Sequence, residues 1–291
     1  MIEHTVIAFG GRALRVAEYG DPDGRPVLVH HGTPACRLLF DQDVDRSCRQ
    51  GIRLISYDRP GYGGSDRLPG RLVVDCAADV RTIAEALGID RLAVWGISGG
   101  GPHALACAAL LSDLVPAVAV LASPAPWGAA GLDYFAGMGE LNVDDTRLQF
   151  EDKPAARAKV EADREEMLRT DPEQFAEMMR TLLGPADKSV FTGELAEFLV
   201  ITTRVALAPG ADGWWDDSEA ELVPWGFELD AIQTPVLLWH GHQDRFVPVG
   251  HGQWLTDHIP GVEAHLPHDD GHLTLTENHL EEINSWLLKR L

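Results

Sequence analysis

The chain has 291 residues, enough for one large α/β domain with an extensive core. Its 24 Lys and Arg stand against 45 Asp and Glu, and the formal net charge of −21 disfavours binding to nucleic-acid phosphates or to anionic membranes. No stretch has the pattern of a secretion signal or an apolar span of about 18 residues, so we expect a cytoplasmic protein without nucleic-acid or membrane partners.

Alternating strand and helix patterns run through the first 123 residues and return near the end. The opening segment 2–20 alternates in polarity around Gly10-Gly11, which predicts an antiparallel hairpin at one edge of a sheet. Segment 73–88 has helical spacing and ends on a glycine. Short apolar runs predict buried parallel strands at 25–32, 52–58, 90–96, 116–123 and 234–241. The fold class expected is therefore α/β, with a mostly parallel doubly wound sheet.

The strand and helix alternation stops between residues 124 and 230. Helical patterns follow one another there, at 155–170, 172–184 and 193–207. We therefore expect a core domain of residues 1–123 and 231–291, interrupted by a helical cap at 124–230. Within 133–230 there are 23 Asp and Glu against 9 Lys and Arg, either a lid that disfavours anionic substrates or simply the solvated faces of helices. Four tryptophans could line an apolar pocket or pack against the core: Trp127, Trp214, Trp215 and Trp225.

Residues 95–107, WGISGGGPHALAC, allow two interpretations. One is a dinucleotide fingerprint, Gly99-x-Gly101-x-x-Ala104, at the start of a helix. Such a site needs an acidic residue at the end of the next strand, and the segment 116–126, PAVAVLASPAP, contains none. We therefore expect no dinucleotide cofactor.

The other interpretation is a nucleophile elbow, in which Ser98 stands on a sharp turn between strand and helix. This chemistry needs an acid and then a histidine farther along the chain. Asp244 follows the predicted strand 234–241, and His272 lies in a later loop. A serine hydroxyl needs an imidazole to take its proton and a carboxylate to orient that imidazole, so Ser98, His272 and Asp244 are the predicted catalytic residues. His268, in the same loop, is the rival histidine.

Acyl transfer also needs two hydrogen-bond donors for the developing oxyanion. The amide of Gly99, at the predicted helix start, is one candidate. The amide of Thr33, in the loop HHGTPA after the strand at 25–32, is the other.

No residue pattern predicts a metal site. The histidines at strand ends, His30, His31, His240 and His242, lack a recognisable ligand spacing, and His103 is expected to be structural. The four cysteines contain no C-x-x-C pair and are expected to be reduced packing residues: Cys36, Cys48, Cys76 and Cys107.

Taken in order, these motifs resemble the α/β-hydrolase fold superfamily, in its branch with a cap. Five stretches spread from about residue 25 to 275 carry the resemblance: His31-Gly32-Thr33-Pro34, the turn DRPGYGGS at 58–65, Gly96-x-Ser98-x-Gly100, Gly241-x-x-Asp244-x-x-x-Pro248 and Gly271-His272. The resemblance implies the α/β-hydrolase fold and a Ser-His-Asp hydrolase.

Two branches of that superfamily fit less well. Proline iminopeptidases usually show H-G-G-P-G and a Trp after the serine, whereas this chain has HHGTPA and Ser98-Gly99. Haloalkane dehalogenases and epoxide hydrolases place Asp at the elbow, and a serine cannot form their alkyl-ester intermediate.

The function expected is cofactor-free hydrolysis of a carboxylic ester or lactone of a small to medium, neutral or apolar compound through an acyl-enzyme. Cleavage of an amide or of a carbon-carbon bond by the same three residues is a second hypothesis for an enzyme. A third hypothesis, from a different functional class, is a ligand receptor that keeps the fold but turns over slowly. The oligomeric state stays open.

Overall fold

A computed structural model describes all 291 residues. One eight-stranded sheet runs through the molecule in the order β1-β2-β4-β3-β5-β6-β7-β8. All neighbouring strands are parallel except at β2, which is antiparallel to both β1 and β4. The strands are β1 (Ile2–Ile7), β2 (Ala13–Tyr19), β3 (Arg25–His30), β4 (Ile52–Tyr57), β5 (Ala93–Ile97), β6 (Val118–Leu121), β7 (Val236–Trp239) and β8 (Glu263–His265).

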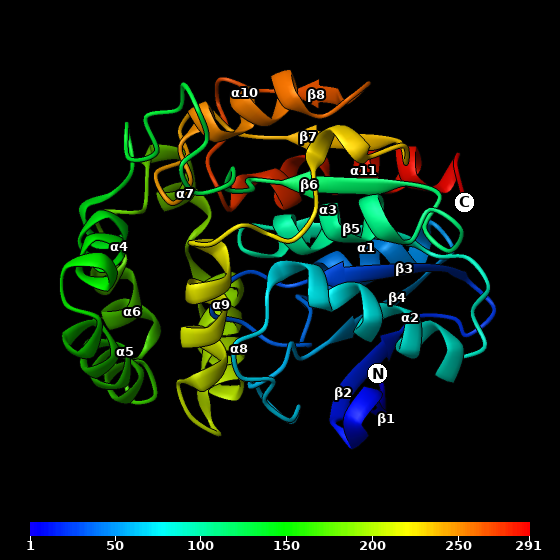
Figure 1. Cartoon of the computed structure of the whole chain (residues 1–291), viewed down its shortest axis with the longest axis horizontal. Helices are drawn as coiled ribbons and strands as arrows, with labels where there is room; N and C mark the ends of the chain where they lie inside the picture. Colours follow the sequence, from blue (N-terminus) through cyan, green and yellow to red (C-terminus); the bar gives the residue numbers. More distant parts are fainter.

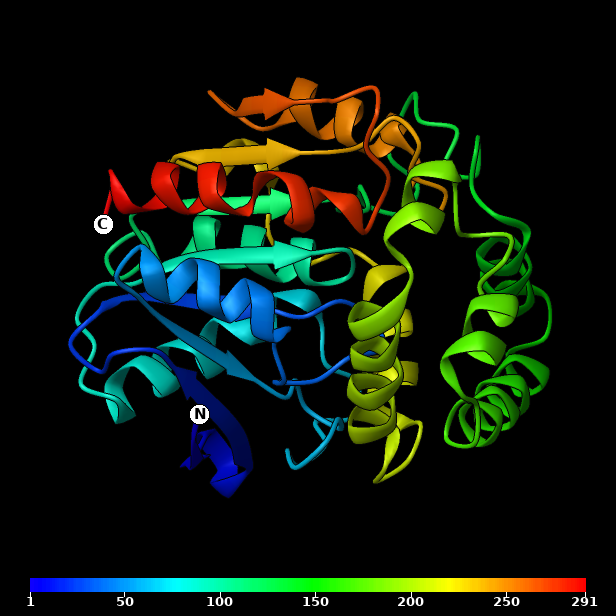
Figure 2. The same cartoon turned by 180° about the vertical axis from the view of Figure 1, so that it is seen from behind.

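Helices cover both faces of this sheet. Helices α1 and α11 pack together on one face, and α2, α3 and α10 lie on the other (Figures 1 and 2). The helices are α1 (Asp41–Arg49), α2 (Cys76–Ala86), α3 (Gly100–Leu110), α4 (Glu140–Glu151), α5 (Lys153–Met167), α6 (Pro172–Met178), α7 (Pro185–Val190), α8 (Gly193–Leu207), α9 (Asp212–Glu221), α10 (Val249–His258) and α11 (Thr274–Leu288). Short 3-10 turns occupy Phe9–Gly11, Val73–Asp75 and Leu229–Ala231. None of these helices is long and apolar enough to span a bilayer.

Two apolar layers sandwich the central strands. Strands β3 to β7 are buried almost throughout, as the continuous apolar runs of parallel strands require. One face of the sheet packs in a cluster of 35 buried residues with α2, α3 and α10, and the other in a cluster of 19 with α11. The predicted α/β fold with a mostly parallel, doubly wound sheet is thus confirmed.

Helices α4 to α9, which we call the helical block, stand beside the sheet at the end toward which the parallel strands point (Figure 1). Ten buried residues form a separate core within it, eight from the helical block itself and two, Cys36 and Tyr62, from loops that follow β3 and β4. The carboxyl ends of the strands therefore face the helical block, and ligands bind at that edge in open α/β sheets.

The boundaries differ from expectation in a few places. The hairpin, the five parallel strands and helix α8 fall at the expected residues. Segment 172–184 is helical only as far as Met178, because Leu182 and Leu183 turn inward in a loop instead of continuing the helix. Helices α1, α4, α7, α9 and α10 were not expected.

Candidate functional site

Ser98 sits on the turn between β5 and α3. It has a φ of 56°, one of only two positive values outside glycine in the chain, so its backbone is strained in the way an elbow requires. The Ser98 amide donates to the Leu121 carbonyl of β6 at 2.9 Å, and its own carbonyl accepts from the Gly101 amide at 2.8 Å. These bonds hold the strained turn, and the side chain is left partly exposed.

Glycines on each side of Ser98 allow close backbone packing. A Cβ on Gly96 would lie 2.7 Å from the carbonyl carbon of Gly100. A Cβ on Gly100 would lie 2.7 Å from the carbonyl oxygen of His31. Any side chain at either position would push α3 away from the strands, so the turn carrying Ser98 depends on both glycines.

His272 and Asp244 come together from two different loops. The ring Nδ1 of His272 donates to Asp244 Oδ2 at 2.7 Å, and both side chains are buried. The other oxygen of Asp244 accepts from the amides of Phe246 and Val247 at 2.8 and 2.9 Å. With Nδ1 engaged by the carboxylate, Nε2 of His272 is the ring nitrogen left to accept a proton.

His268, the other candidate histidine, does not contact Asp244. His268 is exposed and packs against His242, with ring centroids 4.1 Å apart. His272 instead stacks on Phe246 at 4.5 Å, and Phe246 lines the same cavity as Ser98. Of the two histidines in this loop, His272 is therefore the one beside Ser98's cavity and in contact with Asp244.

Asp187, on α7 of the helical block, anchors the loop that carries His272. Its carboxylate accepts from the His272 amide at 3.0 Å and from the Leu273 amide at 2.7 Å. Burial by itself lowers the pKa of His272, but the charge and hydrogen bond of Asp244 and the charge of Asp187 together raise this pKa above its usual value. Sequence reasoning missed Asp187, which is fully buried.

The substitution Asp187→Asn tests this anchor. The variant loses one acceptor and the negative charge near His272, so we expect the free energy of unfolding to fall by about 1–3 kcal/mol. The base role predicted for His272 requires a neutral ring, and without Asp187 the pKa of His272 is lower. We therefore expect the acidic limb of a kcat/KM profile for a neutral ester to move to lower pH.

A pH titration of kcat/KM and a thermal melt check both parts. The control is Glu173→Gln, which removes a charge from an exposed position on α6. An acidic limb that moves equally in the two variants, or in neither, would contradict the anchoring role of Asp187.

The loop after β3 brings Thr33 next to Gly99. A Cβ on Gly99 would collide with the Thr33 hydroxyl and lie 2.6 Å from Oε1 of Glu221. The amides of Thr33 and Gly99 have no backbone acceptor in the turns, loops and caps of the chain. Two adjacent N–H groups are thus left available for a ligand.

A buried ion network holds this loop. Arg59 donates to the carbonyls of His31 and Gly32 and pairs with Asp217 of α9 at 2.6 Å. Asp217 also accepts from Thr33 Oγ1 at 3.1 Å and pairs with Arg71 at 2.6 Å. Burial raises the pKa of Asp217, but the two guanidiniums outweigh burial and hold it well below its usual range.

One cavity of about 400 Å³ opens between the strand ends and the helical block. Ser98, Gly99 and Thr33 line it on the sheet side. Its wall includes four acidic residues and no Lys or Arg: Asp145, Asp163, Glu166 and Glu221. Lys159 pairs with two of the acids, Asp145 and Asp163.

Of the four tryptophans considered from the sequence, only Trp214 lines the cavity. Trp215, its neighbour, carries Lys153 and Arg157 over its ring instead. Trp127 stacks on Phe150, and Trp225 is buried in the larger core. The remaining apolar wall comes mainly from Met138, Leu141, Met167, Met178, Met179, Leu182, Leu222 and Phe246.

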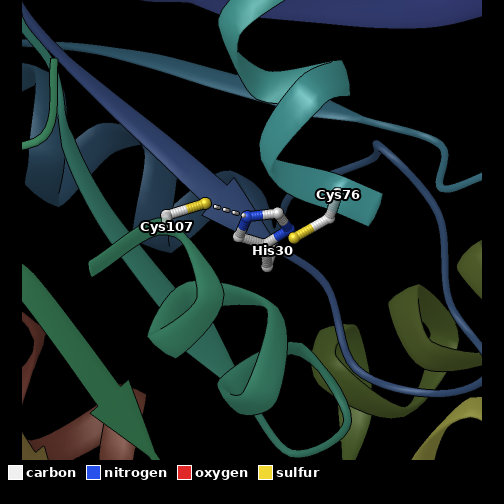
Figure 3. A group of neighbouring side chains, drawn as sticks. All are labelled: His30, Cys76 and Cys107. Carbon is white, nitrogen blue, oxygen red and sulfur yellow. Dashed lines mark hydrogen bonds between the residues drawn. The ribbon is translucent and has the colours of Figure 1, made fainter. Parts of the chain in front are cut away.

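The strand-end histidines make separate local contacts. His31 is held by Gly32 and Arg59, His240 by the Val247 carbonyl, and His103 by the Gly99 carbonyl. Figure 3 shows His30 between Cys76 and Cys107. These three are buried, with ligand atoms within 4.8 Å of one another, and His30 Nε2 lies 3.5 Å from the Cys107 thiol. Two thiols and an imidazole are ligands that suit zinc or copper, but the group has only three members, and none of them lines the cavity of Ser98.

Comparison with known proteins agrees with this architecture. Residues 25–279 match the family model described as alpha/beta hydrolase fold. The chain belongs to the α/β-hydrolase family. A non-heme chloroperoxidase of Streptomyces lividans is 33% identical over 258 residues, covering 84% of this chain and 83% of that protein.

Two further proteins that resemble this chain are named for other activities. A 2-hydroxy-6-oxononadienedioate/2-hydroxy-6-oxononatrienedioate hydrolase of Klebsiella pneumoniae is 25% identical, covering 97% of this α/β hydrolase and 92% of the relative. The esterase EaEST of Exiguobacterium antarcticum superposes with a TM-score of 0.71 at 20% identity, covering 99% of this chain and 100% of the other. Because these names describe different reactions, family membership leaves the substrate to be argued from the cavity.

Proposed function

We propose that this α/β hydrolase is a serine esterase or lactonase, with Ser98 as nucleophile, His272 as base and Asp244 as the residue that orients His272. One observation carries the proposal. Ser98 stands on a strained elbow in the wall of a cavity, and that cavity's Phe246 packs against a histidine already paired with a buried aspartate.

The reaction follows from these positions. Ser98 Oγ attacks the acyl carbonyl while Nε2 of His272 takes its proton, and the carboxylate of Asp244 stabilises the imidazolium that forms. The amides of Thr33 and Gly99 donate to the oxyanion of the tetrahedral intermediate. His272 then gives its proton to the departing alkoxide, and water, activated by the same imidazole, releases the acid from Ser98.

The cavity supports a small or medium, neutral or apolar substrate. Its volume of about 400 Å³ lies in the range of small-molecule sites, and much of its wall is Met, Leu and aromatic. The wall has no Lys or Arg to pair with a carboxylate, and Asp145, Asp163 and Glu166 leave it negatively charged even with Lys159 paired to the first two. The helical block would act as the lid over this site.

The relative named as a dienedioate hydrolase points to a second candidate, cleavage of a carbon-carbon bond by the same three residues. A dioate carries two carboxylates, and the wall offers no Lys or Arg to pair with them. We therefore favour the uncharged ester or lactone.

Substrate charge gives a direct test of this choice. For p-nitrophenyl butyrate against p-nitrophenyl hemisuccinate, acyl groups of equal carbon number, we expect kcat/KM to be at least about tenfold higher for the neutral ester, a difference of about 1.4 kcal/mol. Steady-state kinetics at two salt concentrations measure it, since added salt should narrow the difference. A preference for the hemisuccinate would contradict the proposed substrate class.

The catalytic assignment is tested with a fluorophosphonate probe and burst kinetics. We expect one covalent adduct by intact mass, mapped by peptide digestion to Ser98, and a burst of p-nitrophenol equal to one site per chain. Ligand-induced protection of the helical block without turnover or labelling would support a slow receptor instead.

A further inference from the structure

Glu221, the last residue of α9, places its carboxyl group beside the two free amides. It lines the cavity together with Ser98, and its Oε1 would lie 2.6 Å from a Cβ built on Gly99. The hydroxyl of Thr33 approaches the same built Cβ as closely, so Glu221 and Thr33 both lie against Gly99. The carboxyl thus borders the place where an acyl oxygen would be held by the amides of Gly99 and Thr33.

The same oxygen has nothing to bind within the protein. Oε1 of Glu221 is shielded from solvent and has no hydrogen-bond partner. A buried polar atom without a partner costs free energy, so such an atom in a cavity wall is expected to be satisfied by a ligand.

The surroundings favour the neutral form of this carboxyl. Burial and the charge of Asp217, one helical turn earlier, raise the pKa of Glu221 to about 8, although Arg59 and Arg71 act in the opposite direction. The C-terminal end of α9 also disfavours an anion.

The other charged and titratable groups around the cavity come from four further elements. Burial raises the pKa of Tyr134, in the loop after β6, and the nearby charge of Glu221 raises it further. The acids Asp145 on α4 and Asp163 and Glu166 on α5 line the wall, and His272 lies behind Phe246. None of them forms an ion pair with Glu221, so no directly paired cation holds this carboxyl in its ionised form, and Arg59 and Arg71 act on it only through their charge.

We propose that protonated Glu221 donates a third hydrogen bond to the acyl oxygen of the substrate, beside the amides of Thr33 and Gly99. This inference rests on the proposed serine hydrolase chemistry and adds a catalytic residue to it. An ionised Glu221 would present a negative charge to the oxyanion, so ionisation removes a donor and adds repulsion at the same place.

A pH profile of two variants tests the proposal. Glu221→Gln keeps a donor that cannot ionise, and Glu221→Leu removes the donor. In the native protein, kcat/KM for a neutral ester should fall about tenfold per pH unit above the pKa of Glu221, about 8. The Gln variant should match the native rate near neutrality to within about threefold and keep it at alkaline pH. The Leu variant should be about 100-fold slower than the native protein near neutrality and show no further alkaline fall.

Glu219→Gln is the matched control, because it lies on the same helix but pairs with Lys153 at the surface and does not line the cavity. It should follow the native alkaline fall. The proposal is overturned if Glu221→Gln falls like the native protein, if Glu221→Leu keeps the native rate, or if Glu219→Gln also abolishes the fall. Ester hydrolysis by hydroxide is subtracted with Ser98→Ala, and circular dichroism confirms that each variant is folded.

Fluorophosphonate labelling separates this proposal from the proposed function. If Ser98 labels and turns over while the Glu221 variants behave like the native chain, only the third donor is wrong. If native Ser98 neither labels nor turns over, the serine hydrolase assignment itself has failed.

Discussion

Ser98→Ala is expected to lower kcat for a p-nitrophenyl ester by a factor of about 10⁴ or more, with complete loss of the fluorophosphonate adduct. The reason is that alanine leaves His272 with no hydroxyl to deprotonate, so the acyl-enzyme cannot form. Fold and stability should change little, because the strained φ of 56° is accepted by alanine about as well as by serine and the hydroxyl makes no protein hydrogen bond.

Stopped-flow or steady-state release of p-nitrophenol measures the loss, and intact mass measures the adduct. Ser285→Ala is the matched control and should keep native activity, because the Ser285 hydroxyl only donates to the Glu281 carbonyl on α11 and accepts from the Gln50 side chain. Full activity in Ser98→Ala would mean that a different group attacks the ester.

Asp217→Asn is expected to produce the largest loss of stability, about 3–5 kcal/mol. The aspartate is fully buried and pairs with Arg59 and Arg71, so the amide would leave two buried guanidiniums without their counter-ion. For a chain of this size we expect a fall in melting temperature of about 10 °C. The residual folded protein should also lose activity, because Arg59 and Asp217 together position Thr33.

Calorimetry and urea unfolding measure this change. Asp113→Asn breaks an exposed pair with Arg81 on the surface of the sheet domain, and its melting temperature should stay at the native value. If Asp217→Asn and Asp113→Asn have the same melting temperature, the buried network contributes little to stability and the loop at Thr33 is held by other contacts.

Local patterns were sufficient for the sheet. Strands β3 to β7 are short, apolar and separated by turns and helices, and a parallel sheet buried on both faces imposes that composition. Helix α1 was missed because its sequence, DQDVDRSCR, holds only two apolar residues, too few to mark a helical period. Helix α9 was missed because its Trp214, Trp215 and Asp217 face three different environments, which hides the helical period.

The site residues, too, could be predicted where they carry a local motif and were missed where they do not. The elbow and its two partners carry local motifs, whereas Asp187, Asp217 and Glu221 lie in a segment whose acids looked like solvated helix faces. Their partners are remote in sequence: Asp217 lies 158 residues from Arg59, and Asp187 lies 85 residues from His272. Counting charges over 133–230 therefore predicted that the net charge of this region is negative, but it could not separate the buried carboxylates from the exposed ones.

The pairing of Asp217 with Arg59 and Arg71 has a consequence for how such proteins diversify. If the helical block were replaced by that of a relative, the new block would need an acidic residue at the place of Asp217. Without it, Arg59 and Arg71 would be buried with no counter-ion. Recombination between relatives should therefore succeed when the block travels together with the turn at 58–71, and chimaeras that split these two segments should be recovered mostly as insoluble protein.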